Sequence, residues 1–506
     1  MRKEITIFST LQSDCCRMVV ALVIFVVAIA IVSHAQTLKT LADFTFTEGS
    51  SPNSPLVQGV NGKFYGTTGA GGNSAFCIVD RKPYGCGTTF DVTTAGTLSA
   101  LHMFEGTDGE APISLSETAN GNLFGVTFYT GTLSSGGTVF SMTPNGLLST
   151  LYTFCTEPNC SDGSYPSTRL ALSPTGKLYG ATYGGGVNGS GTIFQITPSG
   201  KLTTVYDFCS QPSCSDGSNP SELIQASNGL MFGTTQSGGK QGGGTVFQVT
   251  PSGTLNTLYS FCSQASCVDG SSPTSLVQGT DGDLYGITQA GGANCLNFLP
   301  SGCGTIFKLT AKGALTTLYS FCAQTNCPDG SFPDGIMQAT DGNLYGTTSQ
   351  GGLSGNWGTI FRIPINGGLQ TVHRFCSQAN CDDGAGPMAG LMQATDGNFY
   401  GTTGEGGSNC LRVAGCGSVF RLTMGLSPFV DIVPSFGKVG SVISILGNDL
   451  EKTKSVTFNG NALAPFTTIS NTLIRVTVPA GATTGVIQVN TVDGALSSNA
   501  AFRVLP

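Results

Sequence analysis

The residues of this 506-residue chain that could do chemistry include a repeated set of carboxylates. Each stands in the pattern acid-Gly-x-x-Pro, and the seven are Glu48, Asp108, Asp162, Asp216, Asp269, Asp329 and Asp383. Seven carboxylates around one face could bind calcium or a polyol. An Asp before Gly is also a common turn former, whose side chain accepts bonds from nearby backbone N–H groups. Because one ligand seldom needs all seven carboxylates, we expect each of them to stabilise a turn. Calcium at the six aspartates is the alternative, and no other cofactor is expected.

Cysteines form the second candidate set. Sixteen of the 18 follow residue 35 and fall into eight local pairs: Cys77/Cys86, Cys155/Cys160, Cys209/Cys214, Cys262/Cys267, Cys295/Cys303, Cys322/Cys327, Cys376/Cys381 and Cys410/Cys416. Repeats that lack one member of a pair lack both, which favours partnership. In an exported chain such pairs predict disulfides. Zinc bound by two neighbouring pairs is the weaker alternative, because no histidine accompanies them.

The remaining reactive side chains are few. The chain has three histidines, and His102 and His373 stand where other repeats carry tyrosine, so we expect packing roles. Serine-hydrolase, zinc-protease and P-loop motifs are absent, and no catalytic residue is predicted. The single tryptophan, Trp357, and two further loop aromatics, Tyr165 and Phe332, are the predicted ligand contacts.

An internal repeat determines what must position these residues. The motif [YF]-G-x-T recurs seven times at intervals of 53 to 60 residues, starting at Tyr65, Phe124, Tyr179, Phe232, Tyr285, Tyr345 and Tyr400. Each copy contains four short β-rich runs, separated on one side by tight x-Gly turns such as Asp281-Gly282. This pattern predicts an all-β, seven-bladed β-propeller, with a solenoid as the alternative.

The two ends of the repeat array predict how the ring closes. The last copy stops after its third strand, at Thr423, whereas an unmatched fourth strand, 38–44, begins the array. We therefore expect residues 38–44 to complete the last blade and cover its open edge. The predicted propeller spans residues 36–424. Its long, cysteine-bearing loops then share one face.

Composition and the N-terminus indicate export. Only 10% of residues are charged and the net charge is −7, which speaks against nucleic-acid binding. Basic residues precede a 15-residue apolar run, Met18 to Val32, and Ser33-His34-Ala35 follows it. This predicts a signal peptide, residues 1–35, cleaved before Gln36. Membrane contact is expected only if that leader is retained.

From Ser427 the pattern changes to alternating apolar strands without cysteine. Residues 427–506 resemble the IPT/TIG immunoglobulin-like family, on Pro434, Gly437, Gly440, Phe458 with Gly460, and 478–485 (VPAGATTG). The resemblance implies an Ig-like β-sandwich. Residues 38–424 resemble the bacterial GloVer tandem-repeat surface proteins, on YGTTSQGG (345–352) and GTVFQVTP (244–251). That family implies varied modes of surface attachment and no established activity.

These observations predict a secreted or cell-surface, non-enzymatic binding or adhesion protein. Its ligand would be an extracellular glycan or protein, bound on the disulfide-rich loop face. A polysaccharide-active hydrolase or lyase is the alternative, with Glu117, Glu222 and Glu405 as the carboxylates that the repeats do not share. A purely structural envelope role comes third.

Overall fold

A computed structural model describes residues 36–72, 77–79, 82–131, 136–294, 302–352, 355–408 and 416–506. Residues Leu38–Pro506 form one compact unit, and Met1–Thr37 form another, of which only Gln36 and Thr37 are described. The predicted signal peptide therefore lies outside the described residues. Within the described ranges, no helix has the length and apolar character needed to cross a membrane.

The described residues of the repeats form seven antiparallel sheets. In six of them the strands follow chain order from first to fourth, and in the seventh the N-terminal strand takes the fourth place. The first three sheets contain β2 (Ser50–Pro52), β3 (Val57–Gln58), β4 (Phe64–Ala70), β7 (Thr88–Val92) and β8 (Leu98–Met103); β9 (Glu110–Glu117), β10 (Leu123–Tyr129), β11 (Thr138–Met142) and β12 (Leu148–Thr153); and β13 (Ser164–Pro166), β14 (Ala171–Leu172), β15 (Leu178–Gly184), β16 (Thr192–Ile196) and β17 (Leu202–Asp207).

The next three sheets contain β18 (Ser218–Gln225), β19 (Met231–Ser237), β20 (Thr245–Val249) and β21 (Leu255–Ser260); β22 (Ser271–Gln278), β23 (Leu284–Ala290), β24 (Thr305–Leu309) and β25 (Leu315–Ser320); and β26 (Ser331–Gln338), β27 (Leu344–Gln350), β28 (Thr359–Ile363) and β29 (Gln370–Arg374). The seventh contains β30 (Met392–Gln393), β31 (Phe399–Thr403), β32 (Ser418–Thr423) and β1 (Thr37–Asp43). A small hairpin, β5 (Ile78–Val79) and β6 (Lys82–Pro83), precedes β7.

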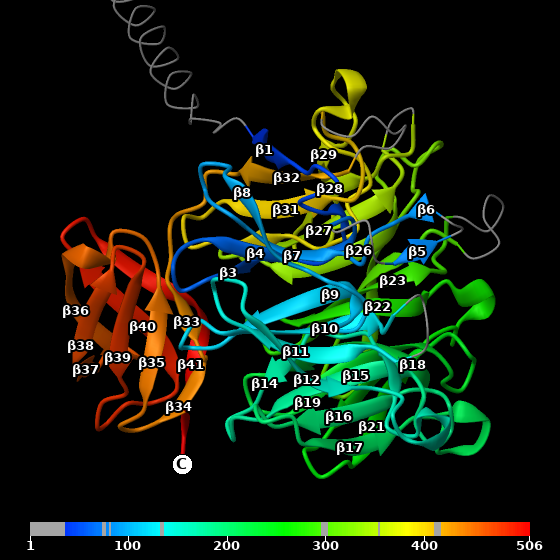
Figure 1. The fold of residues 1–506 in the computed structure, drawn as a ribbon, viewed down its shortest axis with the longest axis horizontal. Coiled ribbons are helices and arrows are strands. Elements are labelled where there is room, and N and C mark those ends of the chain that lie inside the picture. Colours follow the sequence, from blue (N-terminus) through cyan, green and yellow to red (C-terminus); the bar gives the residue numbers. More distant parts are fainter. Residues whose placement is uncertain are drawn as a thin grey trace, which may run out of the picture. The chain divides into compact units, whose positions relative to one another are not determined.

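The N-terminal strand lies where the pattern of the repeats predicts it. Strand β1 is the neighbour of β32, and Figure 1 shows the blue and orange strands side by side. The Phe44 N–H donates to the Gly417 carbonyl at 3.1 Å, as the Phe104 N–H donates to Gly87 within the first sheet. Residues 38–44 thus act as the fourth strand of the last sheet.

The glycine of the repeated [YF]-G-x-T motif packs against a phenylalanine ring in the same way in every sheet. In the fifth sheet Gly286 faces the ring of Phe307, where an added Cβ would come within 2.4 Å of that ring. Phe307 packs edge-on against Phe261 of the preceding repeat, 5.1 Å between ring centres. The Thr288 and Thr305 hydroxyls are 2.8 Å apart and link the second strand to the third. Large rings therefore fill the space between sheets, and glycine makes room for them.

A second repeated contact joins each sheet to the next. The residue directly before the proline of each acid-Gly-x-x-Pro motif has a left-handed backbone, with φ between 53° and 58°. Its N–H donates to a carbonyl of the preceding repeat at 2.7–3.1 Å. The donors are Ser51, Ala111, Tyr165, Asn219, Ser272, Phe332 and Gly386. The acceptor of Ser51 is Cys416, so the first and last repeats are bonded in the same way as adjacent ones.

Residues after the repeats form two further sheets. One has the strand order β33-β35-β39-β38 and the other β34-β41-β40-β36-β37. Their bounds are β33 (Asp431–Val433), β34 (Phe436–Lys438), β35 (Val442–Leu446), β36 (Thr453–Phe458), β37 (Ala462–Ala464), β38 (Phe466–Ser470), β39 (Leu473–Thr477), β40 (Gly485–Thr491) and β41 (Ala495–Leu505). Both sheets contribute to one core around Phe458 and Phe502.

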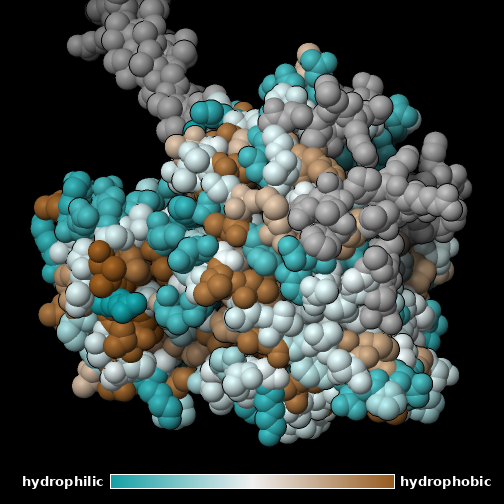
Figure 2. Space-filling model, viewed as in Figure 1, coloured by the Kyte–Doolittle hydropathy of each residue, from teal (hydrophilic) through white to brown (hydrophobic). Residues whose placement is uncertain are grey.

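Apolar side chains are also exposed on these last strands. Examples are Leu463, 68% exposed, and Val442, 58% exposed. Figure 2 shows brown, hydrophobic atoms gathered over this part of the chain. Five 3-10 turns lie among the described residues: Pro158–Cys160, Pro212–Cys214, Ala265–Cys267, Ala379–Cys381 and Leu450–Lys452.

Candidate functional site

The acid-Gly carboxylates lie inside their own loops. Asp269 is fully buried and accepts hydrogen bonds from the Tyr259 hydroxyl at 2.9 Å, the Ser263 N–H at 2.9 Å and the Gln264 N–H at 3.3 Å. Asp162, Asp216 and Asp329 accept from the corresponding tyrosines at 2.8–2.9 Å. These carboxylates are thus hydrogen-bonded to the strand and loop that precede each of them in the chain.

Two repeats use histidine in place of that tyrosine. His102 Nε2 lies 2.6 Å from Asp108, and His373 Nε2 lies 3.0 Å from Asp383. Burial alone would raise the pKa of Asp383, but the hydrogen bonds from His373, Ser377 and Gln378 outweigh it and hold that pKa at about 2. The histidines therefore do more than pack, because each is the partner of a loop carboxylate.

Disulfides close the same loops. Six are described: Cys77–Cys86, Cys155–Cys160, Cys209–Cys214, Cys262–Cys267, Cys322–Cys327 and Cys376–Cys381. Cys295 and Cys410, predicted partners of Cys303 and Cys416, lie outside the described residues.

The one described group of three potential metal ligands is Cys303, Cys322 and Cys327, within 4.8 Å of one another. All three are disulfide-bonded, so none offers a thiolate. Six disulfides are typical of proteins that fold in an oxidising compartment.

The predicted aromatic contacts are separate from one another. Trp357 is half-buried against the apolar cluster that contains Phe375 and Phe399. The Tyr165 ring packs against Phe128, 5.3 Å between centres. Phe332 occupies the position in its repeat that corresponds to Tyr165, one residue before the proline. No single aromatic surface joins the three.

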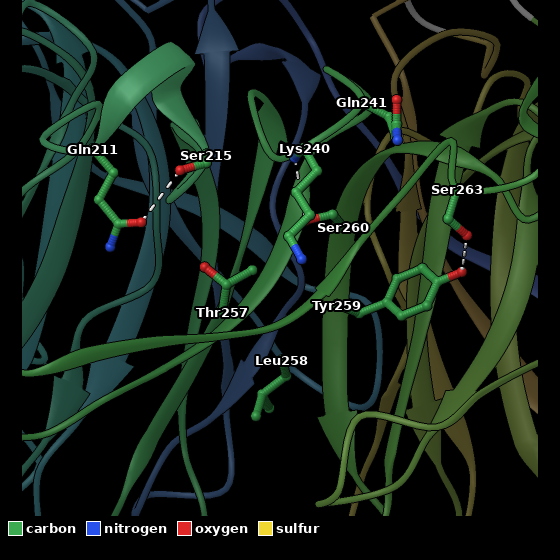
Figure 3. A pocket seen from close by; sticks show the side chains of 9 residues that line it. All are labelled: Gln211, Ser215, Lys240, Gln241, Thr257, Leu258, Tyr259, Ser260 and Ser263. Carbon is green, nitrogen blue, oxygen red and sulfur yellow. Dashed lines mark hydrogen bonds between the residues drawn. The ribbon is translucent and has the colours of Figure 1, made fainter.

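A pocket of about 340 Å³ lies among the disulfide-bearing loops, where a binding face was expected. Gln211 and Ser215 come from one cysteine loop and Ser263 from the next. Lys240 extends between them toward the strand that carries Thr257 and Tyr259 (Figure 3). Two pairs of polar side chains in this pocket bond each other, Ser215 with Gln211 at 3.2 Å and Tyr259 with Ser263 at 2.7 Å.

A second hollow of about 340 Å³, here called the central cavity, is lined by the first-strand region of all seven sheets. One residue from each sheet in chain order gives Asn53, Ser114, Arg169, Glu222, Thr274, Asp334 and Met388. Since seven separate segments converge on it, this cavity is a property of the whole repeat array. It is the best candidate for a functional site.

Every first strand is irregular where it meets this cavity. Four strands, β9, β18, β22 and β26, have a register shift directly after the proline. The other three repeats have one more residue here, and their strands are interrupted, as between β13 and β14. In a regular strand every second side chain would point away from the cavity, and a bulge redirects one of these side chains toward it. Bulges are frequent next to binding sites for this reason. Ser221, Thr274 and Asp334 are such bulge residues.

Arg169 and Glu222 occupy the same position in adjacent repeats, directly before a buried leucine. Arg169 is an exposed side chain that lines the cavity. Burial lowers the pKa of Arg169, while the charges of Glu222 and Asp431 oppose this effect. Its Nε donates to the Ser116 hydroxyl at 3.3 Å.

The cavity carboxyl groups are shifted toward their neutral forms. Burial raises the pKa of Glu222 to about 7, against the Leu223 N–H and the charge of Arg169. Burial likewise raises the pKa of Asp334 to about 6, against hydrogen bonds from Ser349 and Gln289. A cavity with protonatable carboxyls and a guanidinium can bind anions and hydroxyl groups, or transfer protons.

Glu117 has a different role from Glu222. Its Oε1 accepts the Val60 N–H at 2.9 Å, which matches the Gln278 bond to the Ser227 N–H in other repeats. Burial raises the pKa of Glu117 to about 8, and the charge of Asp431 adds to this. Glu117 thus joins two sheets in place of a glutamine.

Of the carboxylates singled out from the sequence, the structure brings only Glu222 into the cavity lining. Glu405 exchanges backbone hydrogen bonds with Ala385 instead. Arg169 and Asp334 were missed. The available signal was the alignment of the seven copies, where Arg169 and Glu222 stand against proline, serine or glycine in the other five.

Solved structures define the class of protein. A streptogramin B lyase aligns with a TM-score of 0.50 at 13% identity, covering 77% of this chain and 98% of the lyase. The extracellular domain of a putative hybrid two-component system from B. thetaiotaomicron also aligns with a TM-score of 0.50, at 11% identity, covering 90% of this chain and 51% of that one. The fold is all-β and propeller-like.

The sequence comparison then gives the family. The Gloeobacter/Verrucomicrobia repeat matches residues 76–299, 210–413 and 295–498, so this chain belongs to that family. Comparison with curated proteins gives no match.

Proposed function

We propose that this protein is an exported or cell-surface binding protein that holds an extracellular glycan, or another small polar ligand, in its central cavity. Its seven sheets are the blades of a propeller that spans residues 36–424. Residues 38–44 close the ring of blades. Residues 427–506 are an IPT/TIG-type Ig-like module. The disulfide-bonded loops, which lead directly into the cavity-lining strands, brace the site and provide a wider surface for the rest of a glycan or for a protein.

One observation carries this proposal: Arg169, Glu222 and Asp334 line the cavity at positions where the other repeats carry uncharged residues. Copies that only built a scaffold would have no reason to place an arginine, a glutamate and an aspartate there. Desolvating the Glu222 and Asp334 carboxyls costs stability unless they are used.

The test is a binding screen of soluble glycans and envelope polysaccharides against the full chain with its disulfides formed, with and without EDTA. Binding that a cavity variant, Glu222→Ala, weakens and that a surface variant, Asp493→Ala, leaves unchanged supports the proposal. Binding that neither variant changes excludes the cavity and returns attention to the loop pocket around Lys240. Binding that EDTA abolishes would assign the site to calcium on the acid-Gly loops.

An enzyme acting on extracellular polysaccharide is the second candidate. Its support is that Glu222 and Asp334, with pKa values near 7 and 6, share a cavity with a cation, which suits general acid–base chemistry near neutral pH. Release of shortened or unsaturated fragments from a bound polysaccharide, lost in Glu222→Gln, would show activity. Binding without any such release would favour the non-enzymatic role.

A further inference from the structure

Arg169 is a cavity cation without a counter-ion. Across the described ranges, no carboxylate lies within the 4.0 Å that defines an ion pair with it. One of its five N–H groups bonds to Ser116, which leaves both terminal nitrogens without a protein acceptor among the described residues. A planar bidentate anion is the best partner for a guanidinium.

Serine hydroxyls line the same cavity. Ser167 and Ser221 donate to backbone carbonyls of the next repeat at 2.8 Å. Ser221 Oγ also lies 3.0 Å from Thr234 Oγ1. Because a hydroxyl oxygen can accept two hydrogen bonds, both serine oxygens can still accept one from a ligand. The cavity volume of about 340 Å³ is at the lower end of the range for small-molecule sites. Both facts indicate a single compact, hydroxylated molecule.

We propose that the central cavity binds a polyhydroxylated carboxylate of monosaccharide size, such as a uronic acid. Its carboxylate pairs with Arg169, and its hydroxyl groups donate to Ser167 and Ser221. This inference rests on the proposed binding function and specifies its ligand. The molecule could arrive free or as the end of an acidic polysaccharide.

The test is isothermal titration of the full chain with four probes: sodium D-glucuronate, D-glucose, sodium acetate and a short polyglucuronate. We expect glucuronate to bind at least about tenfold tighter than glucose or acetate, because only glucuronate offers both the charge and the hydroxyls. Glucuronate and polyglucuronate together distinguish a free acid from a chain end. If only the polymer binds, the source is a polysaccharide.

Variants locate the site. Arg169→Gln should weaken glucuronate binding at least about tenfold and should affect glucose binding less. The affinity of Arg169→Lys for glucuronate should fall between those of the wild type and Arg169→Gln. Arg475→Gln, at an exposed arginine on β39, is the matched control and should change nothing. Thermal unfolding of each variant checks that it is folded. Ser167→Ala, which removes one hydroxyl from the cavity lining, gives a second measurement if Arg169→Gln does not fold.

Each outcome has a clear meaning. Glucose binding as tightly as glucuronate, with no effect of Arg169→Gln, overturns the acidic ligand and leaves the binding function standing. Acetate binding as tightly as glucuronate overturns the role of the hydroxyl partners. If none of the four probes binds while another glycan does, this ligand is wrong, and if no glycan binds at all, the proposed function fails as well.

Discussion

Replacing Asp269 with alanine tests whether the acid-Gly carboxylates hold their turns. Asp269 is fully buried and receives the Tyr259 hydroxyl and the backbone N–H groups of Ser263 and Gln264. Hydrogen bonds to a charged group contribute about 1.5–3 kcal/mol each. Ser263 and Gln264 are exposed, so water can replace part of what is lost. We therefore expect Asp269→Ala to lower the free energy of unfolding by about 2–3 kcal/mol.

The assay is urea unfolding followed by circular dichroism, with disulfides intact and at equal protein concentrations. Asp269→Asn keeps one acceptor oxygen and should lose about half as much. Asp493→Ala is the control, because Asp493 is 63% exposed and its solvent-exposed ion pair with Lys452 contributes little to stability. Repeat arrays can unfold in stages, so the transition of the mutated region is compared between variants.

Calcium provides the refuting result. If added calcium raises the unfolding midpoint of the wild type and Asp269→Ala removes that increase, these carboxylates are metal ligands and the reasoning from turns is wrong. A loss below about 0.5 kcal/mol for Asp269→Ala would refute it too, since the protein donors would then be dispensable.

Three other predictions address the cavity, the disulfides and the closing strand. Burial raises the pKa of Glu222 from its ordinary 4.5 to about 7, so the contribution of the Glu222 side chain to stability is present below pH 4.5 and is lost as pH rises through 7. Glu222→Gln should flatten the pH–stability curve between pH 4.5 and 7. Removing the Cys262–Cys267 disulfide with paired alanines should lower stability by about 2 kcal/mol, as expected for a short loop, and mass spectrometry confirms the missing bridge. Deleting residues 38–44 should expose β32 and cause association visible in size-exclusion chromatography, and a monomer of unchanged stability would contradict the closure.

Much of the fold could be predicted because the same short-range signals recur in every copy. The x-Gly turns, the [YF]-G-x-T strand and the count of fourth strands indicated four-stranded sheets and the exchange of residues 38–44, and β1 beside β32 agrees with that exchange. Local cysteine pairing needed no tertiary information either, because partners five or nine residues apart meet within one loop.

The candidate site was much less accessible. Glu222 was singled out because it breaks the repeat, but Arg169 and Asp334 were not. Trp357 attracted attention as the single tryptophan, yet it packs half-buried against an apolar cluster of the sixth and seventh repeats. Selecting residues that occur once among the repeats therefore identified one cavity residue, Glu222, and also one packing residue, Trp357.

The sequence by itself determined the repeat unit, its strands and its loop bridges, because turns, alternation and short disulfides depend on neighbours in the chain. Only the tertiary structure decided which residues meet. Arg169 and Glu222 are 53 residues apart in sequence, and they line one cavity because seven sheets place equivalent positions around it. The burial that raises the pKa of Glu222 arises only from that assembly.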